Sequence, residues 1–185
     1  MRIGIDARFF GPRDKGFGRY TENLIKELEK ISNDETKFFI FLRKDRWNDY
    51  EPKVPNFHKI LTDYKWYGLK EQILFPLQLK KYKLDLMHFT HFNVPILYRK
   101  KFIVTIHDLT LRYFSTKKRG LKNFIFYPLK QLAYKIVFNY AIKNSQKIIA
   151  ISEYTKKDIL KYYPANSGTS DINSDKIQVI YEGIS

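Results

Sequence analysis

Residues 2–8 read Arg2-Ile3-Gly4-Ile5-Asp6-Ala7-Arg8, and this stretch decides the fold. Its short apolar run between charged residues predicts a buried β-strand. A segment with helical periodicity follows over residues 19–31, where Tyr20, Leu24, Leu28 and Ile31 share one face. A strand followed by a helix is the repeating unit of an α/β domain.

The unit does recur. Short apolar runs predict further strands, and longer segments with helical periodicity predict further helices. Ser152 is a natural N-cap for the last of these helices. The predicted strands are 38–42, 57–61, 84–89, 102–106, 147–151 and 177–181, and the predicted helices are 69–82, 121–144 and 153–162. We expect Pro76 to kink or shorten its helix, Pro128 to interrupt the long one, and residues 164–175 to form a polar loop. The pattern predicts one Rossmann-like, doubly wound α/β domain over residues 1–185, with a mainly parallel sheet and helices on both faces.

Composition narrows the function classes. The chain has 185 residues, enough for one self-sufficient core, and no cysteine, which excludes disulfides and thiolate sites. No apolar run reaches the ~18 residues that a membrane helix needs. Asp6 lies where a signal peptide would need its apolar region, so we expect a cytoplasmic protein.

Charge is the unusual property of the sequence. Lys and Arg number 34 against 19 Asp and Glu, a net charge of +15. Residues 101–150 hold ten basic residues and a single acid, Asp108, which is a local net of +9. Such a field attracts phosphorylated ligands, acidic lipid headgroups or nucleic acid.

Polar residues follow four of the predicted strands, at the edge of the sheet where α/β proteins bind ligands. They are Asp6 and Arg8, the segment 88–93, His107 with Asp108, and Ser152 with Glu153. A loop with Gly11, Gly16 and Gly18 follows the first strand, and its amides would suit a phosphate at a helix start. The alternative for this loop is an ordinary surface turn, because it matches neither Gly-x-Gly-x-x-Gly nor a Walker motif.

The sequence lacks the residue patterns of a metal site and of a serine hydrolase. His88 and His91 have no acid at a metal-binding spacing, and no Asp-x-Asp occurs, so we expect no metal site and interpret His88 as a packed strand-end residue. The Gly-x-Ser-x-Gly elbow of hydrolases is missing as well.

Five segments in order resemble the N-terminal half of the family 4 glycosyltransferases, and together they cover essentially the whole chain. They are residues 2–8 with Gly16-Phe17-Gly18-Arg19-Tyr20, Asp85-Leu86-Met87-His88-Phe89, Val104-Thr105-Ile106-His107-Asp108-Leu109, residues 149–155 and residues 176–183. The resemblance implies a GT-B architecture, in which two Rossmann-like domains face each other across a cleft. The N-terminal domain of such enzymes binds the acceptor, and the C-terminal domain binds the nucleotide sugar.

The resemblance also implies a reaction and a site. The reaction is transfer of a sugar from a nucleotide-diphosphate sugar to a polysaccharide or lipid-linked acceptor, with retention of configuration and without an obligatory metal or other cofactor. His107 matches the histidine beside the transferred sugar. Gly16, Gly18 and Arg19 match the loop that approaches the donor phosphate. The residues expected to line the acceptor side or the cleft are Asp6, Arg8, His91, Asp108 and Ser152.

Two expectations concern partners. The C-terminal donor half of the family has no counterpart in these residues, so we expect a fragment or a separate polypeptide, and little activity without it. The basic residues Lys117, Lys118, Arg119 and Lys122 predict peripheral binding to an anionic inner membrane face. The alternatives are a basic α/β module that binds nucleic acid and a non-catalytic pairing subunit.

Overall fold

The computed structural model describes residues 1–109, 121–163 and 172–183, and it confirms the Rossmann-like α/β fold. Seven parallel strands form one sheet in the order β3-β2-β1-β4-β5-β6-β7. The strands are β1 (Arg2–Asp6), β2 (Lys37–Leu42), β3 (Phe57–Leu61), β4 (Leu86–Phe89), β5 (Phe102–Ile106), β6 (Lys147–Ala150) and β7 (Ile177–Val179). The order reverses between β1 and β4, and a ligand crevice forms at such a switch point.

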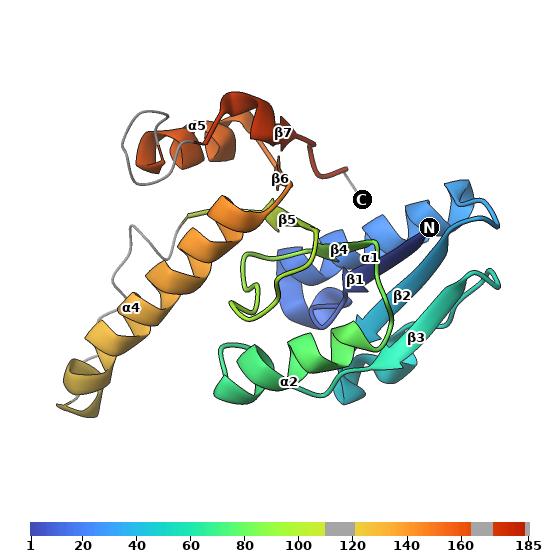
Figure 1. The fold of residues 1–185 in the computed structure, drawn as a ribbon, viewed down its shortest axis with the longest axis horizontal. Helices are drawn as coiled ribbons and strands as arrows, with labels where there is room; N and C mark the ends of the chain where they lie inside the picture. Colours follow the sequence, from blue (N-terminus) through green and yellow to red (C-terminus); the bar gives the residue numbers. More distant parts are fainter. Residues whose placement is uncertain (110–120, 164–171, 184–185) are drawn as a thin grey trace.

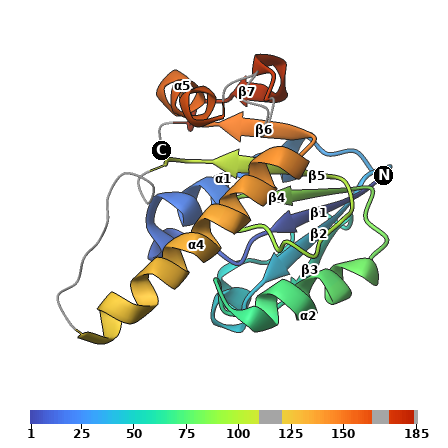
Figure 2. The same cartoon turned by 60° about the vertical axis from the view of Figure 1, so that its left-hand side comes forward.

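Helices cover both faces of this sheet. Helix α1 (Lys15–Ile31) lies on one face, and α2 (Leu69–Lys80) and α4 (Leu121–Asn144) lie on the other (Figures 1 and 2). Helix α5 (Glu153–Tyr162) lies beside β6 and β7. The short helical turns are η1 (Pro12–Asp14), η2 (Lys44–Asp49) and η3 (Ser174–Lys176). Within the described residues, none of the helices is both long and apolar enough to cross a bilayer.

Apolar side chains from the two faces build two cores. On the α1 face, Ile25 packs with Ile5 and Ile40, and all three are fully buried. On the other face, Phe75 of α2 and Phe138 of α4 pack over the central strands in the larger core. Two apolar faces explain why these strands are near-continuous apolar runs rather than alternating ones.

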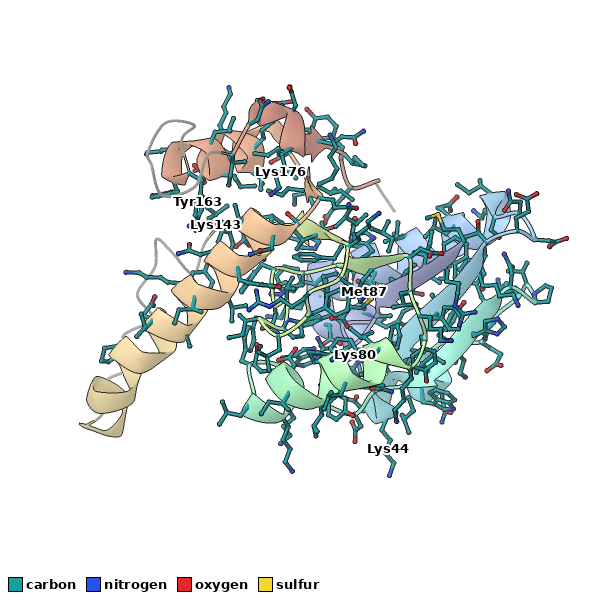
Figure 3. The ribbon with its side chains drawn as sticks, viewed as in Figure 1. Lys44, Lys80, Met87, Lys143, Tyr163 and Lys176 are labelled. Atoms are coloured by element: carbon teal, nitrogen blue, oxygen red, sulfur yellow. The ribbon has the colours of Figure 1, made fainter. Side chains whose placement is uncertain are left out.

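The end of α4 is tied to the last part of the chain. Lys176 donates a hydrogen bond from Nζ to the carbonyl of Lys143 at 2.8 Å, and Tyr163 bonds to Asn139 (Figure 3). An ammonium at a helix C-terminus satisfies a free carbonyl and complements the helix dipole. These contacts hold α4, α5 and β7 together as one unit.

Neither proline ends its helix. Helix α2 runs through Pro76, so the early break expected there is wrong, while a kink at Pro76 stays a prediction. Helix α4 runs through Pro128, so the expected interruption is wrong. Proline removes one backbone hydrogen bond and costs about 3 kcal/mol in a helix interior. Burial of the Pro76 ring in the core offsets that cost, whereas Pro128 is exposed and no described side chain explains the continuous helix. Of the predicted loop 164–175, residues 164–171 lie outside the described part.

The glycine loop also differs from the prediction. Helix α1 starts at Lys15 rather than Arg19, so Gly16 and Gly18 lie in its first turn and Arg19 begins the second. Gly18 is needed there because a Cβ atom would lie 1.9 Å from the carbonyl oxygen of Gly11. The amide of Gly11 in turn donates to the carbonyl of Gly18 at 3.1 Å. The close approach of these two backbones is what folds the loop against the helix.

This packing predicts a contrast between two glycines of one helical turn. Gly18→Ala should lower the free energy of unfolding by about 1–3 kcal/mol, because the added methyl must push backbone atoms apart. Gly16→Ala is the matched control, since a Cβ there meets nothing within 4 Å, and alanine favours a helix. Urea unfolding of both variants measures the contrast. Equal stabilities would show that Gly18 is not required for packing.

Candidate functional site

The candidate site lies at the carboxyl ends of β1, β4 and β5, beside the start of α1. All strands point to this edge of the sheet (Figure 2). Residues predicted from three separate strand ends meet here, as the parallel topology requires. The site is built in two layers, a buried ionic layer below and a partly exposed aromatic layer above.

The ionic layer is centred on Arg8, whose side chain has no exposed surface. Asp6 accepts hydrogen bonds from its Nε at 2.8 Å and its Nη2 at 2.7 Å. Glu71 of α2 lies 2.7 Å from Nη1 and is equally buried. The ring of Phe75 lies under the guanidinium at 4.3 Å. Two carboxylates therefore compensate one buried cation, and their charges raise the pKa of Arg8 although burial itself opposes this.

Glu71 connects this cation to two loops of the site. Its Oε1 accepts a hydrogen bond from Nδ2 of Asn93 at 2.7 Å, and its Oε2 accepts one from the backbone amide of Tyr67 at 2.7 Å. Tyr67 has a φ angle of 59°, which is unusual for a bulky residue, and the bond to Glu71 holds it there. Burial raises the pKa of Glu71, and the charge of Arg8 opposes that rise.

The structure places Asp6 and Arg8 below the surface of the site. Both are expected to line the acceptor side or the cleft, and their side chains are 6% and 0% exposed and pair with each other. In this conformation they hold the loops after β1 and β4, because the carboxylate of Asp6 and the Nε and Nη2 groups of Arg8 hydrogen-bond to each other inside the protein.

The aromatic layer is centred on Phe17 in the first turn of α1. Its ring lies 4.9 Å from the ring of His91 and 4.9 Å from the ring of His107, both edge to face. Phe9 and Tyr20 complete the cluster, at 4.9 Å from His91 and 5.0 Å from His107 respectively. The structure thus brings together the two histidines that the sequence placed at separate strand ends.

His107 is held at both ring nitrogens. Nε2 lies 2.9 Å from the carbonyl oxygen of Thr90, and Nδ1 lies 2.8 Å from Oε1 of Glu182. The backbone carbonyl of His107 accepts a hydrogen bond from Thr155 at 3.1 Å. Only 6% of the side chain is exposed. A ring with this many contacts has a fixed orientation at the strand end.

The other two site histidines are buried and neutral. Burial is the main reason why the pKa of His91 is lowered to about 3 and that of His88 to about 4, and the charge of His107 adds to both effects. His91 accepts the backbone amide of Asn93 at Nδ1, at 3.3 Å. His88 bonds to the hydroxyl of Thr105 at 2.8 Å, which confirms it as a packed strand-end residue. A neutral ring in these positions adds no charge to the site.

The start of α1 offers groups suited to an anion. Gly16 and Arg19 are exposed, whereas Gly18 is buried by its packing role. The first amides of a helix have no acceptor within the helix, and the helix dipole adds positive potential there. Gly16 has no side chain to block approach to these amides.

The remaining predicted site residues lie in different surroundings. Asp108 is exposed next to His107. Ser152 caps α5, since its Oγ accepts the amide of Thr155 at 3.1 Å, so its hydroxyl is engaged in the fold. Lys117, Lys118 and Arg119 lie outside the described residues, as does the side chain of Lys122. In the part of the chain that the structure describes, no group of three His, Asp or Glu side chains is arranged to hold a metal ion.

The sequence did not predict the supporting roles of several residues, although Thr90 and Asn93 lie in the polar segment 88–93 and Phe17 and Glu182 lie in segments that carry the resemblance. The supporting residues are Phe9, Phe17, Tyr67, Glu71, Thr90, Asn93 and Glu182. Arg8 carried a signal, because a lone arginine between apolar residues needs a buried carboxylate. The sequence offers no way to choose Glu71, which lies 63 positions after Arg8 in helix α2.

Comparisons with known proteins agree with this architecture. A family model described as Glycosyltransferase Family 4 matches residues 15–185. Among solved structures, the chain is similar to the apo form of the lipopolysaccharide outer core galactosyltransferase WaaB, with a TM-score of 0.54 and 19% sequence identity. That match covers 100% of this chain and 46% of the other, so this chain spans about half the length of the galactosyltransferase. No curated protein matches in sequence.

The two buried histidines predict a dependence of stability on pH. Their pKa values in the fold, about 4 and about 3, lie below the ordinary 6.5. Their stabilisation is therefore complete above about pH 6.5 and is lost as the pH falls toward these values, because the unfolded chain takes up the protons first. Each histidine should therefore lower the free energy of unfolding at pH 5 by about 2 kcal/mol relative to its value at pH 7.5.

A double variant isolates this contribution from other titrating groups. Between pH 7.5 and pH 5, the free energy of unfolding of the variant with both His88→Gln and His91→Gln should fall by about 4 kcal/mol less than that of the parent chain. Urea unfolding at both pH values gives the two differences. If parent and variant lose the same free energy, the two rings do not carry the effect.

Proposed function

The chain belongs to glycosyltransferase family 4, and on that premise we propose that it is the acceptor-binding half of a retaining glycosyltransferase. The donor is a nucleotide-diphosphate sugar, and the acceptor is a hydroxyl group of a glycan or a lipid-linked glycan. The bond between the anomeric carbon and the diphosphate oxygen breaks, and the acceptor oxygen bonds to that carbon. The acceptor proton leaves, and the anomeric configuration is kept. A donor-binding domain supplies the nucleotide pocket.

One observation carries this proposal, namely that the start of α1 and His107 meet at a single edge of the sheet. The ring of Phe17, in the first turn of α1, lies 4.9 Å from the ring of His107. The start of α1, where Gly16 is exposed, therefore lies at the same edge of the sheet as the fixed imidazole. The leaving diphosphate gains negative charge as the bond breaks, so amides and a guanidinium arranged in advance stabilise the transition state.

Among the side chains that the structure describes, aromatic groups of the basic stretch are packed inside the fold rather than open for nucleic acid. Phe102 and Phe138 of the basic stretch are fully buried in the core. The hydroxyl of Tyr140 bonds to the carbonyl of Tyr98, and its ring stacks on that of Phe102 at 6.2 Å. Exposed aromatic faces are what single-stranded nucleic acid needs. The packing of these rings therefore favours the glycosyltransferase proposal.

A transfer assay with matched histidine variants tests the proposal. The chain is joined to a donor-binding domain of the family, and sugar transfer from nucleotide sugars to a glycolipid in vesicles is measured. His107→Ala should lower kcat by about 10²–10³-fold, the effect of losing one oriented group at a transition state. His58→Ala is the control, because His58 lies on β3 at the far edge of the sheet.

We further propose that the basic residues of the chain bind an anionic membrane surface, and the vesicles test this. Transfer should be faster with anionic than with neutral lipid, and the advantage should vanish at high salt, because each basic residue near an anionic surface contributes about 1 kcal/mol. Equal rates on both vesicles would remove the membrane part. Equal kcat in His107→Ala and His58→Ala would contradict the role of His107 in the reaction.

A further inference from the structure

We propose that Glu182 is a positioning residue that fixes the imidazole ring of His107 in the site. The inference rests on the proposed function, because that function gives His107 its place beside the reacting sugar. The contact itself is independent of any function. Nδ1 of His107 and Oε1 of Glu182 lie 2.8 Å apart and join residues 75 positions apart in the sequence.

The other ring nitrogen decides how Glu182 acts. Nε2 of His107 lies 2.9 Å from the carbonyl oxygen of Thr90, and a carbonyl can only accept a hydrogen bond. Nε2 therefore carries a hydrogen and donates it. This first anchor leaves Nδ1 at the opposite side of the ring, where the carboxylate of Glu182 gives the second anchor. Because an ionised carboxylate can only accept, this second contact is a hydrogen bond when Nδ1 also carries a hydrogen.

Two anchors are needed because the aromatic neighbours do not fix the ring alone. Phe17 and Tyr20 contact it edge to face, with interplanar angles of 64° and 87°. Such contacts have broad minima and tolerate rotation of the ring. Hydrogen bonds at both nitrogens hold the ring plane and its direction, as carboxylates do for histidines in metal sites.

The sheet brings Glu182 to this position. Ile180, just after β7, donates its amide to the carbonyl of Ala150 at 3.0 Å, which continues the pairing with β6. β6 pairs with β5, whose end carries His107. Glu182 is partly exposed, with 37% of its side chain open to solvent, whereas His107 is buried. Glu182 thus reaches inward from the sheet edge to a ring that would otherwise have one polar anchor.

Ring-nitrogen NMR tests the pairing directly. The chain has four histidines, so the ring signals of ¹⁵N-labelled protein can be assigned, and three of them serve as internal references. Glu182→Ala should move the Nδ1 signal of His107 and leave the rings of His88 and His91 in place. Glu182→Gln should restore much of the shift, because its amide oxygen still accepts a hydrogen bond.

Glu153→Gln is the matched control, since Glu153 is an exposed carboxylate at the start of α5. An unchanged Nδ1 signal in Glu182→Ala, or an equal shift in Glu153→Gln, would overturn the pairing.

Kinetics test the positioning role. With a donor-binding domain attached, Glu182→Ala should lower kcat by about 10–100-fold with little change in the KM for donor, the usual effect of losing a group that orients a histidine. Glu182→Gln should recover part of kcat. An unchanged kcat in Glu182→Ala would overturn the role. If no chain transfers sugar, the proposed function fails, whereas the NMR arm still decides whether Glu182 holds His107.

Discussion

The ion group of Arg8, Asp6 and Glu71 is the interaction on which the site depends. A guanidinium without exposed surface is stable only when carboxylates compensate its charge at close range. Asp6 does so from the end of β1, and Glu71 does so from α2, both at 2.7 Å. The charge requirement therefore ties the end of β1 to helix α2 on the face of the sheet, and it fixes where the two elements meet.

The aromatic layer rests on this group. Glu71 accepts hydrogen bonds from the backbone amide of Tyr67 and from the side-chain amide of Asn93. The backbone amide of Asn93 donates to His91. His91 in turn packs against Phe17 at the start of α1. One buried cation thus orders the loops after β1 and β4 and the loop before α2. The exposed groups that suit an anion, Gly16 and Arg19, follow from the close backbone packing at Gly18 rather than from charge.

The sequence predicted the strands well, because buried parallel strands are short apolar runs with clear ends. A helix end at Pro76 was wrong, because burial of the ring outweighs the loss of a helix hydrogen bond. The start of α1 was placed too late, because residues 15–18 are already helical. Strand-end positions such as His91 and His107 were predictable from topology alone. Glu71 and Glu182 were not, since their roles depend on contacts between elements far apart in the sequence.

The most direct test of this account compares two arginines that form ion pairs of the same kind in different surroundings. Arg8→Met leaves Asp6 and Glu71 buried without a counter-charge and should cost about 3–5 kcal/mol in the free energy of unfolding at pH 7. Arg13 pairs with Asp49 at 2.8 Å, but its side chain is 61% exposed, so Arg13→Met should cost about 0–1 kcal/mol. Urea unfolding of both variants measures this difference. A loss in Arg8→Met no larger than in Arg13→Met would contradict the central role of the buried cation.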